Sequence, residues 1–365
     1  MLQIIDELKA KGIPDSQIIY INFEYADFSF IQNDKDLHNY IKNLIVNDDK
    51  YYLFFDEIQN VEHWEKSVNS FKASKNVSIF ITGSNSDLLS GELATHIAGR
   101  YVSFKTFPFT FKEVCKLKNL TAQNDIEKAF DDYITWGGLP QRFMLTDEMQ
   151  TKTYLSDVYD FILLKDIVSR FNIKDIDLFN RIVEYIVTTP SQNFSADNLV
   201  NYFANKDNRE VSKNTLYNYL DYMSKAMLIN KADRYDVRGK RILTGKYKYY
   251  LTDLGFGQIM NIGKRPQLGA YLENIVYNEL LSRGYDVKVG NLDNGEIDFI
   301  ATNFNEKIYI QVAYILADDS VIEREFGAFK SIQDNYPKYV LTLDKFDFSH
   351  DGIIHKNVID WLLEK

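Results

Sequence analysis

The stretch Tyr51-Tyr52-Leu53-Phe54-Phe55-Asp56-Glu57 decides the fold, because five large apolar residues run directly into two carboxylates. A short continuous apolar run is typical of a strand buried on both faces of a parallel sheet. Comparable runs occur at Gln17 to Phe23 and Val77 to Thr82, with a shorter one at Tyr101 to Phe107. The segments before and between them have helical periodicity, at residues 2–11, 34–46 and 61–72. This alternation predicts an α/β doubly wound sheet.

The two carboxylates follow a strand of this sheet at its carboxyl end, where parallel sheets bind their ligands. In P-loop nucleotide hydrolases, a first acid supports Mg²⁺ and the next can polarise the attacking water. Asn85 follows the next strand and is placed to sense a γ-phosphate or orient the water. Arg100 is placed to reach a phosphate across a subunit interface. The alternatives are a strand that ends in a solvated acidic turn and an ordinary surface arginine.

Three longer runs contain these residues or follow them: FFDEIQNVEHWE (54–65), FITGSNSDLLSGELATHIAGRY (80–101) and LKDI (164–167). Together they resemble a prokaryotic family of AAA+ ATPases with a C-terminal nuclease-like domain, and the resemblance continues over residues 192–316. It implies that Asp56 and Glu57 form the Walker B motif, with Asp56 supporting the metal. It also implies Asn85 as sensor-1 and Arg100 as a candidate arginine finger, hence a homo-oligomer. ATP and Mg²⁺ are the cofactors implied for full-length relatives.

A phosphate-binding loop of the form G-x-x-x-x-G-K-[ST] does not occur in these 365 residues. The backbone amides and lysine of such a loop hold the phosphates of a nucleotide. In the family that this sequence resembles, the loop lies just before a helix that matches MLQIIDELKAKG (1–12). We therefore expect an N-terminally truncated P-loop sheet that begins past the first strand and the loop. ATP binding and hydrolysis are expected only in a full-length form.

The middle of the chain has the pattern of a winged helix-turn-helix, with helices followed by two strands that Arg238-Gly239-Lys240 joins. Lys206 to Lys248 holds 11 basic and 5 acidic residues. Basic side chains on a wing suit phosphate contacts, and the second helix of such a motif enters a major groove, so we predict binding to double-stranded DNA. The candidate DNA-binding residues are Lys213, Asn214 and Asn218 on the helix and Arg238, Lys240, Arg241, Lys246 and Lys248 on the wing. The alternative is a fold used for protein contacts, whose basic ribbon is solvated or pairs with the acidic ATPase part.

The C-terminal part resembles a PD-(D/E)xK nuclease core, with Glu273 on a helix, Asp298 on a strand and Gln311-Val312-Ala313 on the next strand. That chemistry needs two carboxylates to hold a divalent metal ion and a lysine to position or activate water. Gln311 replaces the second strand acid and Ala313 replaces the lysine, so we expect a degenerate site in a structural or binding module. Glu296 shares a strand face with Asp298 and could partly replace the missing acid. A metal-dependent DNA nuclease is the competing enzyme hypothesis.

Composition limits the classes of protein to which this chain can belong. The chain has 52 acidic and 42 basic residues, and its single cysteine excludes an intrachain disulfide. The longest stretch without a charged residue has 12 residues, too few for a helix that spans a membrane. We expect a cytoplasmic, DNA-associated AAA+ relative with four parts: a truncated ATPase core (1–110), a helical lid or connector (111–175), a winged helix (176–262) and a degenerate nuclease-like domain (263–365). A non-enzymatic DNA- or protein-binding module is the third hypothesis.

Overall fold

The structure is a computed structural model that describes residues 1–83, 101–260, 267–292 and 295–364, without the side chains of 244–246. The chain forms two compact units, residues 1–105 and 106–365, and each is described by itself. None of the helices within the described ranges is long and apolar enough to cross a lipid bilayer.

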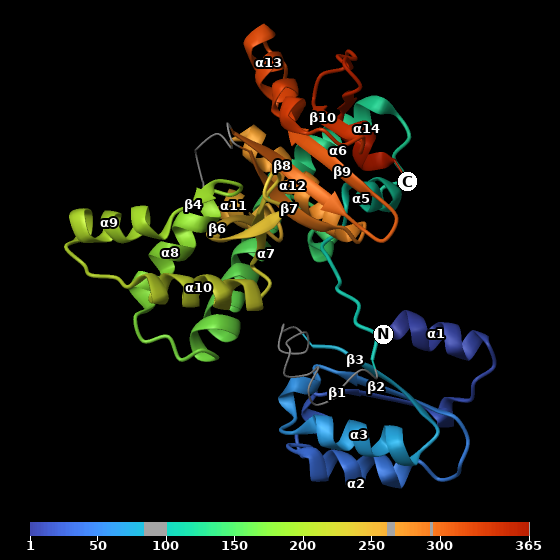
Figure 1. The fold of residues 1–365 in the computed structure, drawn as a ribbon. Helices are drawn as coiled ribbons and strands as arrows, with labels where there is room; N and C mark the ends of the chain where they lie inside the picture. Colours follow the sequence, from blue (N-terminus) through green and yellow to red (C-terminus); the bar gives the residue numbers. More distant parts are fainter. Residues whose placement is uncertain (84–100, 261–266, 293–294, 365) are drawn as a thin grey trace. The chain divides into compact units, whose positions relative to one another are not determined.

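The first unit is built on a parallel sheet in the order β1-β2-β3, with β1 at Ile18–Asn22, β2 at Tyr51–Asp56 and β3 at Val77–Ile81. Its helices are α1 (Leu2–Ala10), α2 (Asp34–Leu44) and α3 (Trp64–Ser74), and α2 and α3 lie together along one face (Figure 1). Leu53 and Phe55 pack in the core that includes Phe71 of α3. Phe54 points to the opposite face and stacks on Phe80, with ring centroids 4.6 Å apart. The strand at 51–56 is thus buried on both faces, as its sequence predicts.

Two elements of this unit differ from the prediction. The helix expected from Val61 begins at Trp64, because a 3-10 turn over Ile58–Asn60 and left-handed backbone at Glu57 and His63 (φ 55° in both) delay it. The strand expected at Tyr101 to Phe107 is wrong, since these described residues form neither strand nor helix. Val102 and Phe104 are 78% and 86% exposed. A strand without a partner or a covering layer leaves backbone groups unpaired, which favours an irregular conformation here.

The second unit begins with helices: α5 (Phe111–Leu117), α6 (Gln123–Trp136), α7 (Glu148–Phe161), α8 (Ile176–Thr188), α9 (Ala196–Asp207) and α10 (Lys213–Lys225). α7 runs directly into a π-helix over Ile162–Ser169, which contains the LKDI run. Side chains cap the amino ends of α9 and α10. The Ser195 hydroxyl accepts from the Asn198 N–H, and the Ser212 hydroxyl accepts from the Thr215 N–H.

A mixed sheet in the order β11-β10-β9-β8-β7-β5-β6-β4 occupies the rest of the second unit (Figure 1). Its strands are β4 (Asn193–Phe194), β5 (Ile229–Asp236), β6 (Arg241–Leu251), β7 (Asp286–Leu292), β8 (Gly295–Thr302), β9 (Lys307–Val312), β10 (Lys338–Thr342) and β11 (Ile354–Asn357). The helices that accompany them are α11 (Gly255–Met260), α12 (Leu268–Ser282), α13 (Asp319–Gly327) and α14 (Val358–Leu363). β5 pairs in parallel with β7, with Arg234 opposite Val289. The segments predicted as separate parts at 176–262 and 263–365 therefore contribute strands to one sheet.

Candidate functional site

Asp56 lies at the carboxyl end of β2, in register with Asn22 of β1. The Tyr20 hydroxyl donates to Asp56 Oδ2 at 2.8 Å, and the Thr82 hydroxyl donates to Asp56 Oδ1. Burial and then the hydrogen bond to Asp56 raise the pKa of Tyr20, so its hydroxyl stays a donor. Both oxygens of the half-buried carboxylate are oriented, and each keeps a lone pair for a further ligand.

Glu57 follows with a left-handed backbone (φ 55°), which ends the strand. Its N–H donates to Thr82 Oγ1 at 3.3 Å, and Gln59 Nε2 donates to Glu57 Oε2 at 2.5 Å. Thr82 therefore contacts both acidic residues, since its hydroxyl donates to Asp56 and accepts from Glu57. This arrangement holds the two acidic residues at one end of the sheet, and within the described ranges it leaves Glu57 Oε1 for a water molecule.

The oxygens at this edge fit Mg²⁺, which prefers carboxylate and water ligands. The amino-acid sequence supplies no G-x-x-x-x-G-K-[ST] loop for the phosphates of a nucleotide. Asn85 and Arg100 lie outside the described residues, so their roles stay predictions. Tyr20 and Thr82 were not predicted. Tyr20 lies in the middle of β1 and Thr82 directly follows β3, and neither hydroxyl belongs to a sequence motif. Only the register of the sheet brings them to Asp56.

The basic hairpin between β5 and β6 exposes Arg238, Lys240 and Arg241 at its tip. Asp236 closes the turn, because its Oδ1 accepts from the Gly239 N–H at 2.9 Å and its Oδ2 lies 3.7 Å from Arg241 Nε. The Lys246 side chain is outside the described residues. The tip thus presents cationic side chains at the surface, and its role as the wing of a DNA-binding motif stays a prediction.

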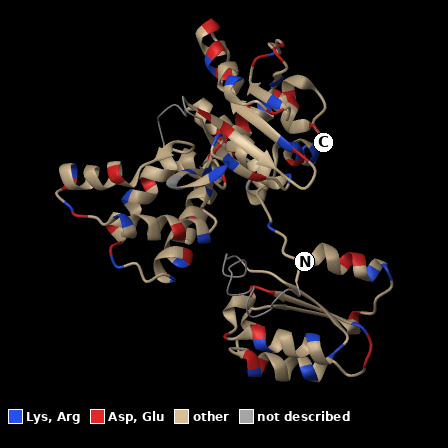
Figure 2. Cartoon of the chain, in the orientation of Figure 1, with Lys and Arg blue, Asp and Glu red and all other residues tan. Residues whose placement is uncertain are grey.

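α10 exposes Asn214 and Asn218, which are four residues apart and so share one face of the helix. Lys213 is also exposed, but its ammonium lies 2.5 Å from Asp197 of α9. Basic and acidic positions are interspersed along the helices of this unit (Figure 2). The predicted base-edge residues are accessible to a ligand, and their role in DNA binding stays a prediction.

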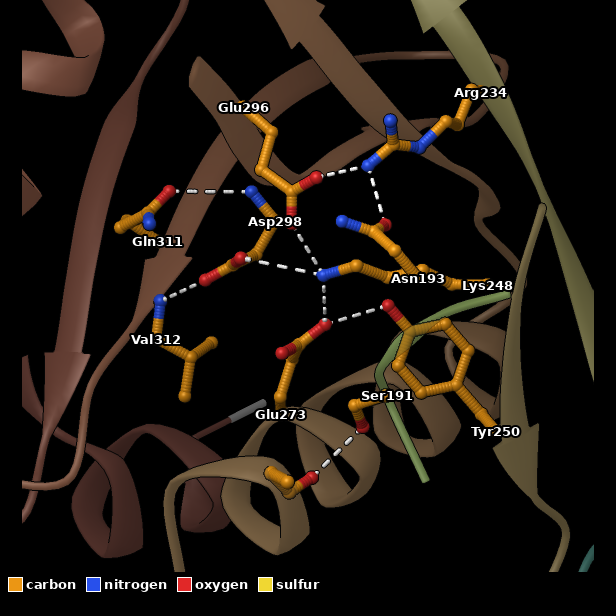
Figure 3. A network of polar contacts seen from close by, with 11 residues as sticks. Ser191, Asn193, Arg234, Lys248, Tyr250, Glu273, Glu296, Asp298, Gln311 and Val312 are labelled. Carbon is orange, nitrogen blue, oxygen red and sulfur yellow. Dashed lines mark hydrogen bonds and ion pairs between the residues drawn. The ribbon is translucent and has the colours of Figure 1, made fainter. Parts of the chain in front are cut away.

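Lys248 requires a correction to the predicted set of phosphate contacts. It is only 3% exposed, and its side chain enters a network of carboxylates instead of facing solvent (Figure 3). Residues two apart on a strand share a face, and Lys248 and Tyr250 both face Glu273 of α12. A buried lysine that contacts carboxylates is not available to a DNA phosphate.

Three carboxylates meet around the Lys248 ammonium. Its Nζ lies 2.6 Å from Glu296 Oε1, 3.0 Å from Glu273 Oε1 and 3.9 Å from Asp298 Oδ1. Glu296 and Asp298 are alternate residues of β8, which places both on one face of the sheet. Glu273 approaches from α12, so helix and strands contribute to a single cluster, which we call the Lys248 network.

Further donors orient these carboxylates: Tyr250 OH to Glu273 Oε1 at 2.7 Å, the Val312 N–H to Asp298 Oδ2 at 2.8 Å, and the Arg234 guanidinium to Glu296 Oε2 (Figure 3). Gln311 contributes through its Oε1, which accepts from the backbone N–H of Asp298 at 3.2 Å. The Gln311 amide therefore supports the β8–β9 pair in this structure and does not supply a carboxylate.

Burial governs protonation in the Lys248 network. Burial alone would lower the pKa of Lys248, but the charges of Glu273, Asp298 and Glu296 outweigh it and raise that pKa above its ordinary value. Burial and then the charge of Glu273 raise the pKa of Asp298 well above its usual range. Burial also raises the pKa of Glu273, although Lys248 and Tyr250 act in the opposite direction. Lys248 therefore stays charged, and the network favours a proton on a carboxyl group.

The structure brings together Glu273, Asp298 and Gln311, the residues that the sequence assigns to a degenerate nuclease site, with Glu296 beside them. It places Lys248 there as well, which the sequence did not predict. The two-residue alternation of β6 gives no signal for this position, because it groups Lys248 with Lys246 and opposite the apolar Tyr247, Tyr249 and Leu251. Nuclease ancestry of this site stays a prediction.

Comparisons with known proteins identify related sequences. Family models match an AAA domain over residues 1–115 and a domain of unknown function (DUF8612) over residues 127–266. An uncharacterized protein of Haemophilus influenzae is 36% identical, over all of this chain and 90% of its own length. The uncharacterized protein MJ1544 of Methanocaldococcus jannaschii is 34% identical, over 87% of this chain and 73% of its own length. Among solved structures, the Walker-type ATPase PABY2304 of Pyrococcus abyssi aligns with a TM-score of 0.37 and 16% identity, over 62% of this chain and 67% of that one.

The AAA match includes the β2 strand with Asp56 and Glu57, and the two sequence relatives match over most of their own length. Similarity of this extent is shared by members of one family. The chain therefore belongs to the same family as the Haemophilus influenzae and Methanocaldococcus jannaschii proteins, and its residues 1–115 match an AAA domain.

Proposed function

We propose that Asp56 and Glu57 are the hydrolytic residues of an ATPase, active in a form of this protein that carries a phosphate-binding loop ahead of Leu2. The observation that carries the proposal is the fixed orientation of Asp56, whose two oxygens accept from Tyr20 and Thr82. A solvated acidic turn has no need of two hydroxyl donors from flanking strands. The AAA match over residues 1–115 supports the same assignment.

Each residue has a distinct role in the proposed site. Asp56 holds Mg²⁺, which supplies charge neutralisation for the phosphates when it is bound. Glu57 Oε1 accepts a hydrogen bond from the attacking water and orients it, while the hydrogen bond from Gln59 keeps the carboxylate in position. Thr82 links the Asp56 carboxylate to the Glu57 backbone, because its hydroxyl donates to the carboxylate and accepts from the Glu57 N–H.

Calorimetric titration with ATP and Mg²⁺ tests the proposal. The 365-residue chain should show no detectable binding, because its sequence lacks the loop that supplies most phosphate contacts. A chimera with one added strand and a G-x-x-x-x-G-K-[ST] loop joined before Leu2 should bind ATP with a Kd of roughly micromolar order. β3 forms one edge of the described sheet, so the added strand has a partner for pairing.

Glu57→Gln in the chimera should block ATP turnover and spare ATP binding, since the amide cannot act as a base. Glu62→Gln is the matched control, because Glu62 is an exposed acid five residues away and should leave both properties unchanged. Tight ATP binding by the unmodified chain would contradict the proposal. Undiminished turnover in the Glu57→Gln chimera would contradict the role of Glu57.

We also propose that the basic hairpin and α10 bind double-stranded DNA. The observation in favour is the exposure of Arg238, Lys240 and Arg241 at one hairpin tip. The order of elements supports a winged helix, since three helices precede the hairpin and the short strand β4 pairs with β6. Cations on such a tip would contact backbone phosphates, and Asn214 and Asn218 would reach base edges.

The salt dependence of duplex DNA binding tests this second proposal. Each phosphate contact contributes about 0.9 to the slope of log affinity against log salt, so replacing the three hairpin residues by alanine should flatten that slope by up to about three units. A control triple, Lys152→Ala with Lys330→Ala and Lys345→Ala, removes three exposed cations from other elements and should preserve the slope. An unchanged slope in the hairpin variant would exclude the hairpin from DNA binding.

A further inference from the structure

The Lys248 ammonium lies among the carboxylates that the sequence assigns to a divalent metal ion (Figure 3). Glu296 and Glu273 place oxygens 2.6 and 3.0 Å from its Nζ, and Asp298 Oδ1 lies 3.9 Å away. An ammonium ion and a metal dication repel each other strongly at such distances in a buried site. The two cations would therefore compete for the same oxygens.

The Lys248 network already holds cations beside its carboxyl groups. Lys248 and Arg234 are those cations, and they contact Glu273 and Glu296 directly. Asp298 is the remaining carboxyl group, and its Oδ1 lies 3.9 Å from Lys248 Nζ. Two positive charges thus face three carboxyl groups, which leaves at most one net negative charge to attract a dication.

The sheet holds Lys248 in this position. β6 lies between β5 and β4, and Lys248 is in register with Ala232 on one side and Asn193 on the other. The Lys248 side chain is 4% exposed. Its ammonium cannot exchange with solvent by a simple side-chain rotation, since it would leave buried carboxylates without a partner.

We infer that the Lys248 ammonium is the resident cation of this site and takes the place of the divalent metal ion that nuclease-like carboxylates would hold. The residues present do not fit a metal ion, because a buried cation already contacts their oxygens and Gln311 supplies no charge. Among the described residues, no group of three or more His, Cys, Asp or Glu side chains is arranged to hold a metal ion. The site is thus a built-in ion cluster that joins β6, β8 and α12 and does not cleave phosphodiesters.

Removing the Lys248 ammonium should allow the site to bind a metal ion. Lys248→Met keeps an unbranched side chain of similar length and removes the charge, so Glu273, Glu296 and Asp298 would face one another without their shared cation. Carboxylates that are deprotonated and close together bind divalent cations. The Lys248→Met variant should therefore gain a metal site that the natural chain lacks.

Titration of the full chain with Mn²⁺, followed by electron paramagnetic resonance at about pH 8, tests the inference. The natural chain should show no stoichiometric binding up to about 1 mM Mn²⁺ and no cleavage of plasmid DNA. Lys248→Met should bind one Mn²⁺ at least about tenfold more tightly, and Asp298→Asn in that background should abolish the gain. Lys231→Met is the matched control, since Lys231 is a lysine of the neighbouring strand with a half-exposed side chain.

Measurements of Mn²⁺ binding and DNA cleavage by the natural chain test the inference even if the Lys248→Met variant does not fold. Stoichiometric Mn²⁺ binding to the natural chain that Asp298→Asn removes would overturn the inference, as would Mn²⁺-dependent DNA cleavage that Asp298→Asn abolishes. A folded Lys248→Met variant without Mn²⁺ binding would overturn it as well. Absence of binding in the natural chain supports it, and a gain of binding in Lys248→Met supports it further.

Discussion

Lys248→Met should destabilise the second unit in a way that depends on pH. The substitution removes the cation that lies 2.6 and 3.0 Å from Glu296 and Glu273. Breaking a buried ion pair by removing one partner costs about 3–5 kcal/mol, because the other charge stays buried without compensation. For a unit of this size, 1 kcal/mol corresponds to about 2–4 °C, so the melting temperature should fall by roughly 6–20 °C near neutral pH.

The pH dependence follows from the remaining carboxyl groups. Lys248 lowers the pKa values of Glu273 and Asp298, so its loss raises both further above their ordinary values. A carboxyl group whose pKa is raised in the folded state destabilises the fold progressively as pH rises from its unfolded pKa through its folded pKa. The difference between the variant and the natural chain should therefore be largest at about pH 8 and should shrink at about pH 5, where the carboxyl groups take up protons.

Differential scanning calorimetry of the full chain at several pH values measures this difference. Lys231→Met is the control, because the Lys231 side chain is 45% exposed and lies 3.6 Å from Asp233, an arrangement worth at most about 1 kcal/mol. Its effect should not grow between low and high pH. A loss in Lys248→Met of less than about 1 kcal/mol, or an equal loss at both pH values, would refute our account of the Lys248 network.

Two further substitutions test how the second unit is held together, each measured as a shift in melting temperature. Gly137→Ala should cost roughly 3 kcal/mol or more, because φ is +76° and the added carbon would lie 1.8 Å from Asp253 Oδ1, whereas Gly269→Ala meets nothing within 4 Å and should be neutral. Asn274→Leu should cost about 1–3 kcal/mol, since the Asn274 amide pairs with both the N–H and the carbonyl of Leu251 at 2.8 Å. Asn278→Leu should cost less, because the Leu251 carbonyl keeps its bond from Asn274. Equal effects in either pair would contradict these assignments.

Much of the first unit could be predicted from its apolar runs. Tyr51 to Phe55 reads as a strand buried on both faces, and the structure confirms a central parallel strand at Tyr51–Asp56. The run at Tyr101 to Phe107 has similar composition and forms no strand, because composition cannot show whether a partner strand or a cover is present. The hydroxyl of Thr82 at Asp56 likewise depends on the register between strands that are distant in sequence.

The Lys248 network shows a different limit of prediction. Glu273, Glu296 and Asp298 were grouped from strand periodicity and a family resemblance, and the structure brings them together. Lys248 was assigned to an exposed wing, because the basic residues from 238 to 248 read as one continuous ribbon. The basic residues at the tip of the ribbon are exposed to solvent. Lys248 lies farther along β6, which is inside the sheet, and its charge is buried.

The Lys248 network also bears on how the predicted parts of the second unit depend on each other. Its cations come from β5 and β6, within residues 176–262, whereas its carboxylates come from α12 and β8, within residues 263–365. Each segment alone would retain buried charges without their partners, and β7 would lose the pairing that joins it to β5. A cation from one segment therefore neutralises the acids of the other, so the segments 176–262 and 263–365 would fold as one body.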